Sequence, residues 1–510
     1  MKMKRKIISF MLLLCMLCSS VLLAACNSGA GTETTPSTNA PTGESGGDTG
    51  KTEPELSGKT YDGQTFRVLM SGYGASKLSD FAEENKNGYS RVASAIYLRN
   101  EMVKNLYQIE IEDTEKFGTS TGAGPGYNAV TQDFASDDYS YELCVVGTLD
   151  AAKLAIGGYL YDLNSLPYVD LDCSWWDQNA NEGLEIHGKM FYTTGDISVV
   201  DNISTHTLLF NKTVATQYSV TDLYDSVKNG TWTYDKFLNY IKLVTDDVDG
   251  SQTMDYKDKY GLLTWNDVLQ ASLVGSGVRV AVIDENGEMK LTLYDEKTVS
   301  LINALTEVFN DGKHVYNYTT RNLGSTQSWQ TYDSERDAMF GQDRCLFYGM
   351  TLNAVPRYRD HQTLNFGILP YPKYNQEQES YGSYVGASYS AMYCVEGTVP
   401  DDMLEFVGTV TESLAYEAQK TVTPEYYEQT LKGRYLQDEE SWEMLDIIFS
   451  ERIFDVGMYY KIPETNPLTE QITAIISRKE QGTFTSRYES TRTAALARII
   501  ELNQQWKEFE

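Results

Sequence analysis

The fold is decided by a stretch that begins Thr65-Phe-Arg-Val-Leu-Met70, an apolar run with the composition of a buried strand. From Ser90 to Tyr107 apolar residues recur at helical spacing, and Ile109-Glu-Ile-Glu112 then alternates as a strand does. A second strand and helix follow in residues 141–146 and 150–156. Strand, helix and strand in this order predict βαβ units and an α/β sheet.

Such a sheet binds ligands beyond the carboxyl ends of its strands, which places the loops at residues 71–75 and 147–150 on the expected binding edge. Further secondary structure is predicted along the rest of the chain. The segments are a strand at 207–210, a helix from Thr233, alternating runs at 278–283 and 290–293, a strand at 364–369 and an amphipathic closing helix from Thr491. The body is therefore expected to be α/β throughout.

The composition limits the classes of function. A length of 510 residues with 41% hydrophobic residues predicts two or three packed domains. The 42 Lys and Arg residues stand against 72 Asp and Glu, a formal net charge of −30, which repels phosphate backbones and argues against nucleic-acid binding. Four histidines in the whole chain argue against a His-rich metal centre.

The first 26 residues have the features of an export signal. Lys2, Lys4 and Arg5 precede an apolar run that ends in Leu23-Ala-Ala-Cys26. These last four residues resemble the lipobox of bacterial lipoproteins, which implies cleavage before Cys26 and palmitate-type acylation of that residue. A permanent transmembrane anchor is the alternative, although the run is at the short limit for a span.

Residues 27–57 hold almost only Gly, Ser, Thr, Pro, Asn and Glu, so we expect a flexible linker between the lipid and the folded body. The protein is thus predicted to be exported and tethered to the outer face of a bacterial cell membrane. Four cysteines, Cys144, Cys173, Cys345 and Cys394, belong to the folded body. Their sequence leaves disulfides open, and we favour buried free thiols because none forms a C-x-x-C pair.

Several phrases together resemble the extracellular solute-binding proteins, family 1, of ABC importers, in their carbohydrate-associated branch. The phrases are Tyr97-Leu-Arg-Asn100, Gly158-Tyr-Leu-Tyr-Asp-Leu163, Ser174-Trp-Trp-Asp177, Gly188-Lys-Met-Phe-Tyr192, Gly195-Asp-Ile-Ser198, Phe210-Asn-Lys212, Leu223-Tyr-Asp-Ser-Val-Lys-Asn-Gly-Thr-Trp-Thr233 and Tyr260-Gly-Leu262. The resemblance extends over residues 65–455. It implies a periplasmic-binding-protein-like fold of type II, with two hinge-connected α/β lobes and a ligand cleft between them.

The resemblance also sets the expected domains and partners. We expect a signal peptide at 1–25, a lipidated Cys26 with its linker at 26–57, a first lobe at 58–200 plus 370–422, and a second lobe at 201–369 plus 423–510. The chain should pass between the lobes near 196–204, 369–372 and 421–425. The implied partners are a carbohydrate ligand, the permease subunits of the importer and the membrane through the lipid, with the protein itself a monomer.

Sugars need flat aromatic faces and fixed polar groups, and the chain places both on segments expected to face the cleft. The candidates are Tyr73, Trp175, Trp176, Asp196, Trp265, Asn266, Tyr348, Tyr384 and Ser388. For one of the Trp175–Trp176 pair a core role is favoured over that of a ligand platform, whereas Asp196 is as readily a cap of the chain reversal and Trp265 fits either role. Tyr73 and Tyr384 lie among glycines, where the backbone can approach a ligand closely.

One loop has the spacing of a calcium site. Oxygen-bearing side chains stand at positions 1, 3, 5, 7, 9 and 12 of a twelve-residue loop, as in an EF-hand, and they belong to Asp247, Asp249, Ser251, Thr253, Asp255 and Asp258. Gln252 replaces the glycine of the sharp turn and Asp258 is shorter than the usual Glu. A solvated acidic loop is the alternative to a structural calcium, and no other cofactor is expected.

The leading hypothesis is a lipid-anchored solute receptor for an oligosaccharide, with no catalytic activity. No Gly-x-Ser-x-Gly, His-Glu-x-x-His or P-loop motif is present. The alternatives are an exported glycoside hydrolase, because the separation of two catalytic carboxylates is not visible in a sequence, and a receptor for a non-sugar solute such as a peptide.

Overall fold

The computed structural model describes residues 51–72, 80–81, 90–319, 329–358, 363–436, 438–477 and 482–509. The predicted signal peptide, Cys26, most of the predicted linker and Tyr73 lie outside these residues. Among the helices in the described ranges, none combines the length and the apolar character that crossing a membrane requires.

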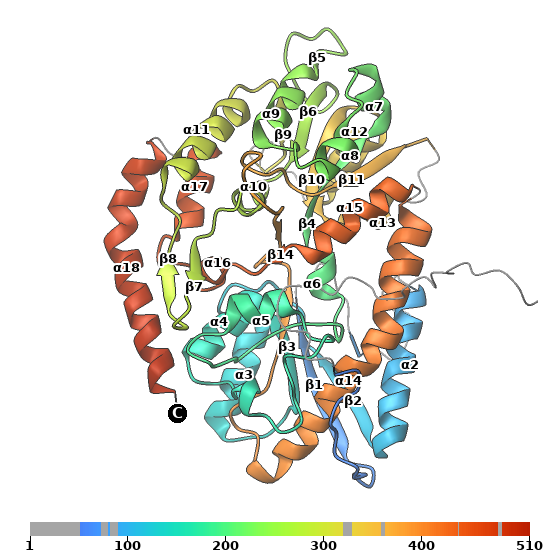
Figure 1. The fold of residues 1–510 in the computed structure, drawn as a ribbon, viewed down its shortest axis with the longest axis vertical. Coiled ribbons are helices and arrows are strands. Elements are labelled where there is room, and N and C mark those ends of the chain that lie inside the picture. The colour runs from blue at the N-terminus through green and yellow to red at the C-terminus, as the bar shows by residue number, and fades with distance from the viewer. Residues whose placement is uncertain are drawn as a thin grey trace, which may run out of the picture. The chain divides into compact units, whose positions relative to one another are not determined.

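The first three strands of the chain and β13 form a four-stranded sheet in the order β13-β3-β1-β2. Figure 1 labels β1, β2 and β3 of this sheet in its lower half. Strand β1 pairs in parallel with β2 and β3, and β13 is antiparallel to β3. The predicted strand, helix, strand order is confirmed, because α2 lies between β1 and β2 in the chain. The bounds are β1 Thr65–Ser71, α2 Ser90–Tyr107, β2 Glu110–Glu115, β3 Leu143–Gly147 and β13 Ala391–Cys394.

A second sheet has six strands, in the order β11-β4-β10-β6-β5 with β9 paired to β6. Strand β6 is parallel to β9 and β10, whereas β4 runs antiparallel to β10 and β11. Buried apolar residues of both sheets belong to one hydrophobic core cluster among the described residues. The bounds are β4 His206–Asn211, β5 Thr245–Asp246, β6 Lys259–Thr264, β9 Val315–Asn317, β10 Cys345–Thr351 and β11 Phe366–Leu369.

Two small sheets complete the strands. The hairpin of β7 and β8 forms at the predicted alternating runs, and β12 pairs in parallel with β14. The bounds are β7 Ala281–Ile283, β8 Met289–Leu291, β12 Ser383–Tyr384 and β14 Arg452–Ile453.

Many helices begin at a side chain that accepts a backbone N–H, which satisfies one of the unpaired donors of the first turn. Asp177 caps α5, Asn211 caps α7 and Asp295 caps α11 in this way. The remaining helices are α3 Pro125–Ser136, α4 Thr148–Ile156, α5 Gln178–Leu184, α6 Val200–Ile203, α7 Lys212–Gln217, α8 Leu223–Lys228, α9 Tyr234–Leu243, α10 Val268–Gly275, α11 Glu296–Asn310, α12 Trp329–Gly341, α13 Val355–Tyr358, α14 Leu404–Pro424, α15 Glu439–Ser450, α16 Val456–Tyr459, α17 Leu468–Ile476 and α18 Phe484–Glu508. Short 3₁₀ helices span Leu163–Ser165, Leu352–Ala354 and Asp401–Met403, and a π-helix spans Glu425–Tyr435.

The chain passes between the two large sheets at more than one place. Thr193 bridges Tyr393 in the four-stranded sheet, and the chain enters the six-stranded sheet at His206. It leaves that sheet at Leu369 and re-enters the first at Ala391. Helix α14 then contacts α2, and after the π-helix α15 contacts β11. The exact lobe boundaries stay predictions.

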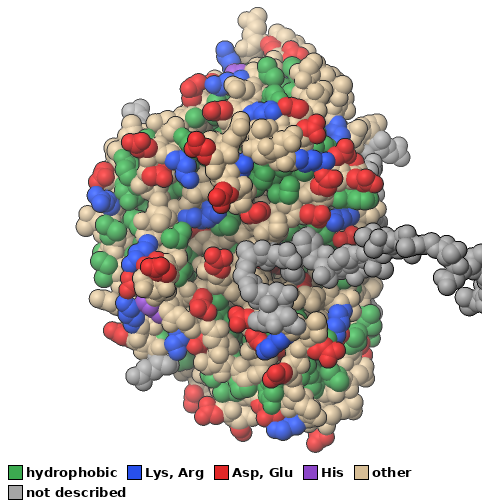
Figure 2. Space-filling view, in the orientation of Figure 1, with side chains coloured by type: hydrophobic (Ala, Val, Ile, Leu, Met, Phe, Trp, Pro, Cys, Tyr) green, Lys and Arg blue, Asp and Glu red, His purple; other side chains and the backbone are tan. Residues whose placement is uncertain are grey.

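The four cysteines of the body are buried free thiols, in line with the favoured interpretation. Charge is not gathered into one patch on the face that Figure 2 shows, where Asp and Glu side chains are interspersed with Lys and Arg.

Candidate functional site

Three parallel strands of the six-stranded sheet end at one edge. Strands β6, β9 and β10 share a direction, and β4 begins where β10 ends, since His206 pairs with Thr351. Trp265 directly follows β6, and Tyr318 directly follows β9. Because ligands of α/β sheets bind at the carboxyl ends of the strands, this edge is the candidate site.

Five rings, which we call the junction cluster, gather at this edge: His206, Trp265, Tyr318, Tyr384 and Tyr389. The imidazole of His206 stacks on Tyr384 with ring centres 5.2 Å apart, and its centre lies 5.5 Å from that of Trp265. The centre of Trp265 lies 6.3 Å from Tyr318 and 6.5 Å from Tyr389. Residues from four separate parts of the chain therefore form one aromatic cluster, most of which is buried.

His206 is the innermost member of the junction cluster. It is fully buried, and neither of its ring nitrogens has a hydrogen-bond partner among the described residues. Burial lowers the pKa of His206 to about 3, so the ring is neutral at physiological pH. Trp265 and Tyr384 are also buried, whereas Tyr389 is half-buried and faces outward in part.

Polar side chains lie next to Trp265, and they belong to Asn266, Asn317 and Thr319. The Asn266 N–H donates to Thr319 Oγ1 at 3.3 Å, and Asn317 Nδ2 donates to Asn266 Oδ1 at 3.1 Å. Burial raises the pKa of the next residue, Asp267, and the nearby polar groups of Trp265 and Tyr389 partly offset this rise. The carboxyl group of Asp267 thus belongs to the segment that directly follows Trp265.

The edge of the four-stranded sheet is tied to the same region by residues 385–390, which we call the junction segment. Thr205 bridges Val385 at one end of this segment. At the other end the Thr148 N–H donates to the Ser390 carbonyl at 3.1 Å, and the two hydroxyls are 2.6 Å apart. The carboxyl end of β3 is therefore joined directly to the segment that carries Tyr389.

A buried ion network joins β14 to the segments around α5 and α6, close to where the chain crosses from the first large sheet to the second. Arg452 in β14 binds Asp201 in α6 with Nη1 and Oδ2 2.8 Å apart, and it also pairs with Asp177 and Asn202. Burial raises the pKa of Asp201 to about 7, while the charge of Arg452 opposes the rise. Asp196 accepts from Thr423 Oγ1 at 2.7 Å, and burial raises its pKa to about 7 as well.

The structure separates the predicted ligand residues into two groups. Trp265, Asn266, Tyr384 and Ser388 lie at or beside the junction cluster, with Asn266 and Ser388 half-buried. Their role in binding stays a prediction.

The remaining predicted residues lie elsewhere. Trp175 and Trp176 are buried and donate their indole N–H groups to Glu412, while Asp196 is held by Thr423. Tyr348 is fully buried beside Phe340, with ring centres 5.5 Å apart. These side chains offer almost no surface to a ligand in this conformation, and Tyr73 lies outside the described residues.

Sequence reasoning missed His206, Tyr318, Tyr389, Asp267 and Arg452. Asp267 and Tyr389 directly follow predicted residues, so extending each predicted segment by one residue would have included them. His206, Tyr318 and Arg452 carry no local signal, because only the strand order brings them to the edge.

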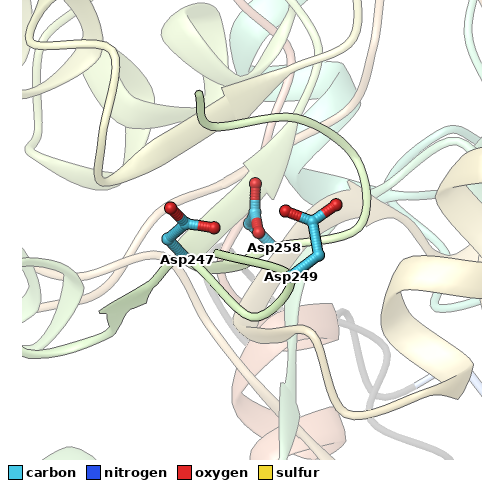
Figure 3. Close-up of side chains that lie close together, drawn as sticks. All are labelled: Asp247, Asp249 and Asp258. Atoms are coloured by element: carbon cyan, nitrogen blue, oxygen red, sulfur yellow. The ribbon is translucent and has the colours of Figure 1, made fainter. Parts of the chain in front are cut away.

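Three of the six predicted calcium ligands come together in the loop before β6 (Figure 3). Asp247, Asp249 and Asp258 each offer a carboxylate oxygen, and these atoms lie within 4.8 Å of one another. Backbone N–H groups of the same loop already donate to all three carboxylates, for example Gln252 to Asp247 Oδ2 at 2.7 Å. The Ser251 hydroxyl donates to the Thr253 carbonyl at 2.9 Å.

The other predicted ligands are also occupied within the loop. Asp255 accepts from the Lys257 N–H at 2.8 Å, and Lys257 Nζ lies 3.9 Å from Asp249 Oδ2. Calcium binding therefore stays a prediction, because the loop satisfies its own carboxylates.

Two α/β sheets joined by chain that crosses between them give this protein a two-lobed α/β fold, which solved structures of sugar-binding proteins share. A cyclo/maltodextrin-binding protein complexed with maltotetraose matches 88% of this chain and 98% of its own, with a TM-score of 0.53 and 13% identity. An ABC substrate-binding protein from Listeria monocytogenes in complex with cycloalternan covers 88% of this chain and 100% of its own, with a TM-score of 0.52 and 12% identity.

A maltose/maltodextrin-binding domain from Bdellovibrio bacteriovorus bound to maltotriose gives a TM-score of 0.51 at 12% identity, over 87% of this chain and 100% of its own. No protein-family model matches the chain, and no curated protein matches it. The predicted two-lobed α/β fold is confirmed by these structures, all of which are binding proteins.

Proposed function

We propose that the protein is a lipid-anchored extracellular receptor of an ABC importer, which captures an oligosaccharide and delivers it to a membrane permease without catalysing a reaction. The observation that carries the proposal is the position of the junction cluster. It lies at the carboxyl edge of the six-stranded sheet, in a fold whose solved examples hold maltotetraose, cycloalternan and maltotriose.

The chemistry of the cluster fits a sugar. Aromatic faces accept the C–H faces of pyranose rings, while Asn266 and Asp267 offer hydrogen-bonding groups to hydroxyls. Micromolar affinity needs only about 8 kcal/mol, which a few stacked rings and hydrogen bonds can provide after the cost of association. Opening of the two lobes would be needed to expose Trp265 and Tyr384, and hinge bending is the motion of this fold class.

A melting-temperature screen against oligosaccharides of varied linkage identifies the ligand, because a micromolar binder at millimolar concentration stabilises by about 4 kcal/mol. With that ligand, Trp265→Ala should weaken binding at least tenfold, about 1.4 kcal/mol. The matched control is Trp442→Ala, because Trp442 is a half-buried tryptophan in α15 whose N–H donates to Lys432 and Leu436 carbonyls. Equal affinity of the Trp265 variant and the parent would remove Trp265 from the site.

The anchor is tested separately from the ligand. With the signal and Cys26 intact, the protein should fractionate with membranes and carry acyl chains detectable by mass spectrometry. Cys26→Ala should abolish both. Membrane retention of this variant would instead support the transmembrane alternative.

The hydrolase alternative predicts a different result. A receptor forms a stable complex and releases no reducing sugar, whereas a hydrolase consumes the same oligosaccharide. Release of reducing ends by the purified protein would overturn the receptor proposal. Stabilisation by peptides alone would favour the non-sugar receptor.

A further inference from the structure

The last helix of the chain, α18, is long enough to reach from one lobe to the other. Its 25 residues give a length of about 37 Å at a rise of about 1.5 Å per residue. Figure 1 shows α18 along one flank of the molecule, beside the β7–β8 hairpin, and the helix contacts β8 directly. The contacts at its two ends show that it connects the lobes.

The first end of α18 packs on the lobe of the six-stranded sheet. The ring of Tyr488 stacks on that of Tyr294, with centres 4.4 Å apart, and the ring centre of Phe484 lies 5.7 Å from that of Tyr294. Tyr294 lies two residues before α11, which contacts both α18 and β9 of the six-stranded sheet. Tyr488 and Phe484 are buried, so apolar packing holds this end of the helix.

The second end of α18 packs on the lobe of the four-stranded sheet. The ring centre of Phe191 lies 5.8 Å from that of Trp506 and 5.2 Å from that of Phe509. The segment that carries Phe191 is bound to β13, because Thr193 and Tyr393 exchange two backbone hydrogen bonds at 3.0 and 2.8 Å. Trp506 is buried and Phe509 is half-buried. Aromatic contacts therefore hold this end of the helix to the other lobe.

The β7–β8 hairpin makes a second connection between the lobes. The helices that flank it in the chain, α10 and α11, contact strands of the six-stranded sheet. At its turn, the Gly287 carbonyl accepts the N–H of His187 at 3.0 Å, and His187 follows α5 in the other lobe. Asn503 of α18 holds the hairpin, since its side chain exchanges two hydrogen bonds with the Met289 backbone, at 2.9 and 3.0 Å.

We propose that α18 and the β7–β8 hairpin, residues 281–291 and 484–509, form a strap that limits how far the two lobes can separate. Each end of the strap holds one lobe, so wide opening must break either the contacts of Tyr488 or those of Trp506 and Phe509. The rings at each end would then return apolar surface to water, which opposes wide opening. This restraint goes beyond the proposed function, because it does not depend on which solute the protein binds.

The first experiment releases one end of the strap in the full-length protein, without any ligand. Phe509→Ala is used alone and combined with Trp506→Ala, and the radius of gyration from small-angle scattering should rise above the parent value. Ile500→Ala is the matched control, because Ile500 lies on the same helix and is 58% exposed, and its radius should equal that of the parent. If the double variant does not fold, Phe509→Ala alone decides. An unchanged radius in the folded variants overturns the inference.

Hydrogen exchange of the same proteins locates the change. The amide of His187 donates to the hairpin of the other lobe, so its exchange reports the contact between them. Peptides that contain His187 should exchange about fivefold faster in Phe509→Ala than in the parent, because release of the strap opens this hydrogen bond more often. Peptides of β9 should keep the parent rate. Equally faster exchange in both places would show a general loss of stability and would count against the inference.

The two ends of the strap distinguish a restraint from a local packing defect. Tyr488→Ala releases the end that lies about 30 Å along the helix from Phe509, and it should also speed the exchange of the His187 peptides. The double variant Tyr488→Ala/Phe509→Ala should change this exchange no more than the stronger single variant, because a strap released at one end restrains nothing. Additive effects, or no effect of Tyr488→Ala at His187, overturn the inference.

Discussion

Single buried residues set much of the chemistry of this protein. The indole N–H groups of Trp175 and Trp176 donate to the two oxygens of Glu412, at 2.8 and 2.9 Å. Burial raises the pKa of Glu412 to about 8, although both tryptophans oppose the rise by hydrogen bonding to the charged form. Trp175 and Trp176, which could have stacked on a sugar, are thus held in the core by Glu412.

The His206→Phe variant tests whether burial lowers the pKa of the His206 imidazole in the folded protein. The folded pKa of His206 is about 3, below the unfolded value near 6.5, so the folded state binds fewer protons and loses stability as the pH falls through this window. A phenyl ring has no proton to bind. The stability of the variant relative to the parent should therefore rise by about 2 kcal/mol between pH 8 and pH 5.

Urea unfolding at the two pH values measures this difference, with the urea m-value checked for constancy. If the difference in stability between the variant and the parent does not change with pH, His206 is protonated in the folded protein. Loss of ligand affinity in the same variant would show that the ring nitrogens face the solute.

At the scale of elements, β14 is short but joins several passages of the chain. It pairs with β12, and its Arg452 binds Asp177 at the start of α5 and Asp201 in α6. Asp201 and Asp177 belong to segments near the first passage between the sheets, whereas β12 belongs to the second. The guanidinium group of Arg452 therefore links β14 to α5 and α6, which lie near the segments where a hinge motion would occur.

Replacing Arg452 by Met should destabilise the protein by about 3–5 kcal/mol, because Asp177 and Asp201 would be left as uncompensated buried charges. Chemical denaturation measures the loss. Lys507→Met is the matched control, since Lys507 pairs with Glu288 at 2.7 Å on the surface and should cost less than about 1 kcal/mol. Similar losses in both variants would mean that the Arg452 network contributes little.

The loop before β6 gives a further prediction. If Asp247, Asp249 and Asp258 hold calcium, chelator should lower the melting temperature, and added calcium should restore it. Asp249→Asn should abolish this response. An identical melting curve with and without chelator would leave the loop as an acidic turn satisfied by its own N–H groups.

Helices and strands were predictable where a local pattern of apolar residues indicates them. They were less predictable where packing against the rest of the chain determines their position. Residues 65–70 and 90–107 were predicted closely because β1 is apolar and α2 is periodic. Helix α3 was missed, since Pro125 and Gly126 are turn signals that here lie inside the first turn of a helix. The junction cluster was only partly predicted, because the position of His206 follows from the order of β4 and β10 in the sheet.

At the scale of the whole molecule, burial of acids is a recurring theme. It raises the pKa of Asp196 and Asp201 to about 7, of Glu412 to about 8 and of Glu396 to about 9. Asp196, Glu412 and Glu396 keep their protons in the folded state at a pH where the unfolded chain has released them, whereas the charge of Arg452 favours the ionised form of Asp201. Their combined effect outweighs the opposite contribution of His206.

The melting temperature should therefore be highest near pH 5 and fall as the pH rises to about 9. A raised carboxyl pKa stabilises the fold fully below the unfolded value, near 4, and this stability is lost as the pH rises through the folded value. Differential scanning calorimetry across this range measures the trend. Glu412→Gln should flatten it between pH 5 and 8, and a melting temperature that rises with pH would contradict the assignment.

The burial of the thiols gives each sheet its own chemical reporter. Cys144 and Cys394 lie opposite each other in β3 and β13, while Cys345 opens β10 in the other sheet. A buried thiol reacts with an alkylating reagent only when its surroundings open. Pulse alkylation of the unmodified protein, read by peptide mass spectrometry, would thus reveal whether the two halves unfold as one cooperative unit or one after the other.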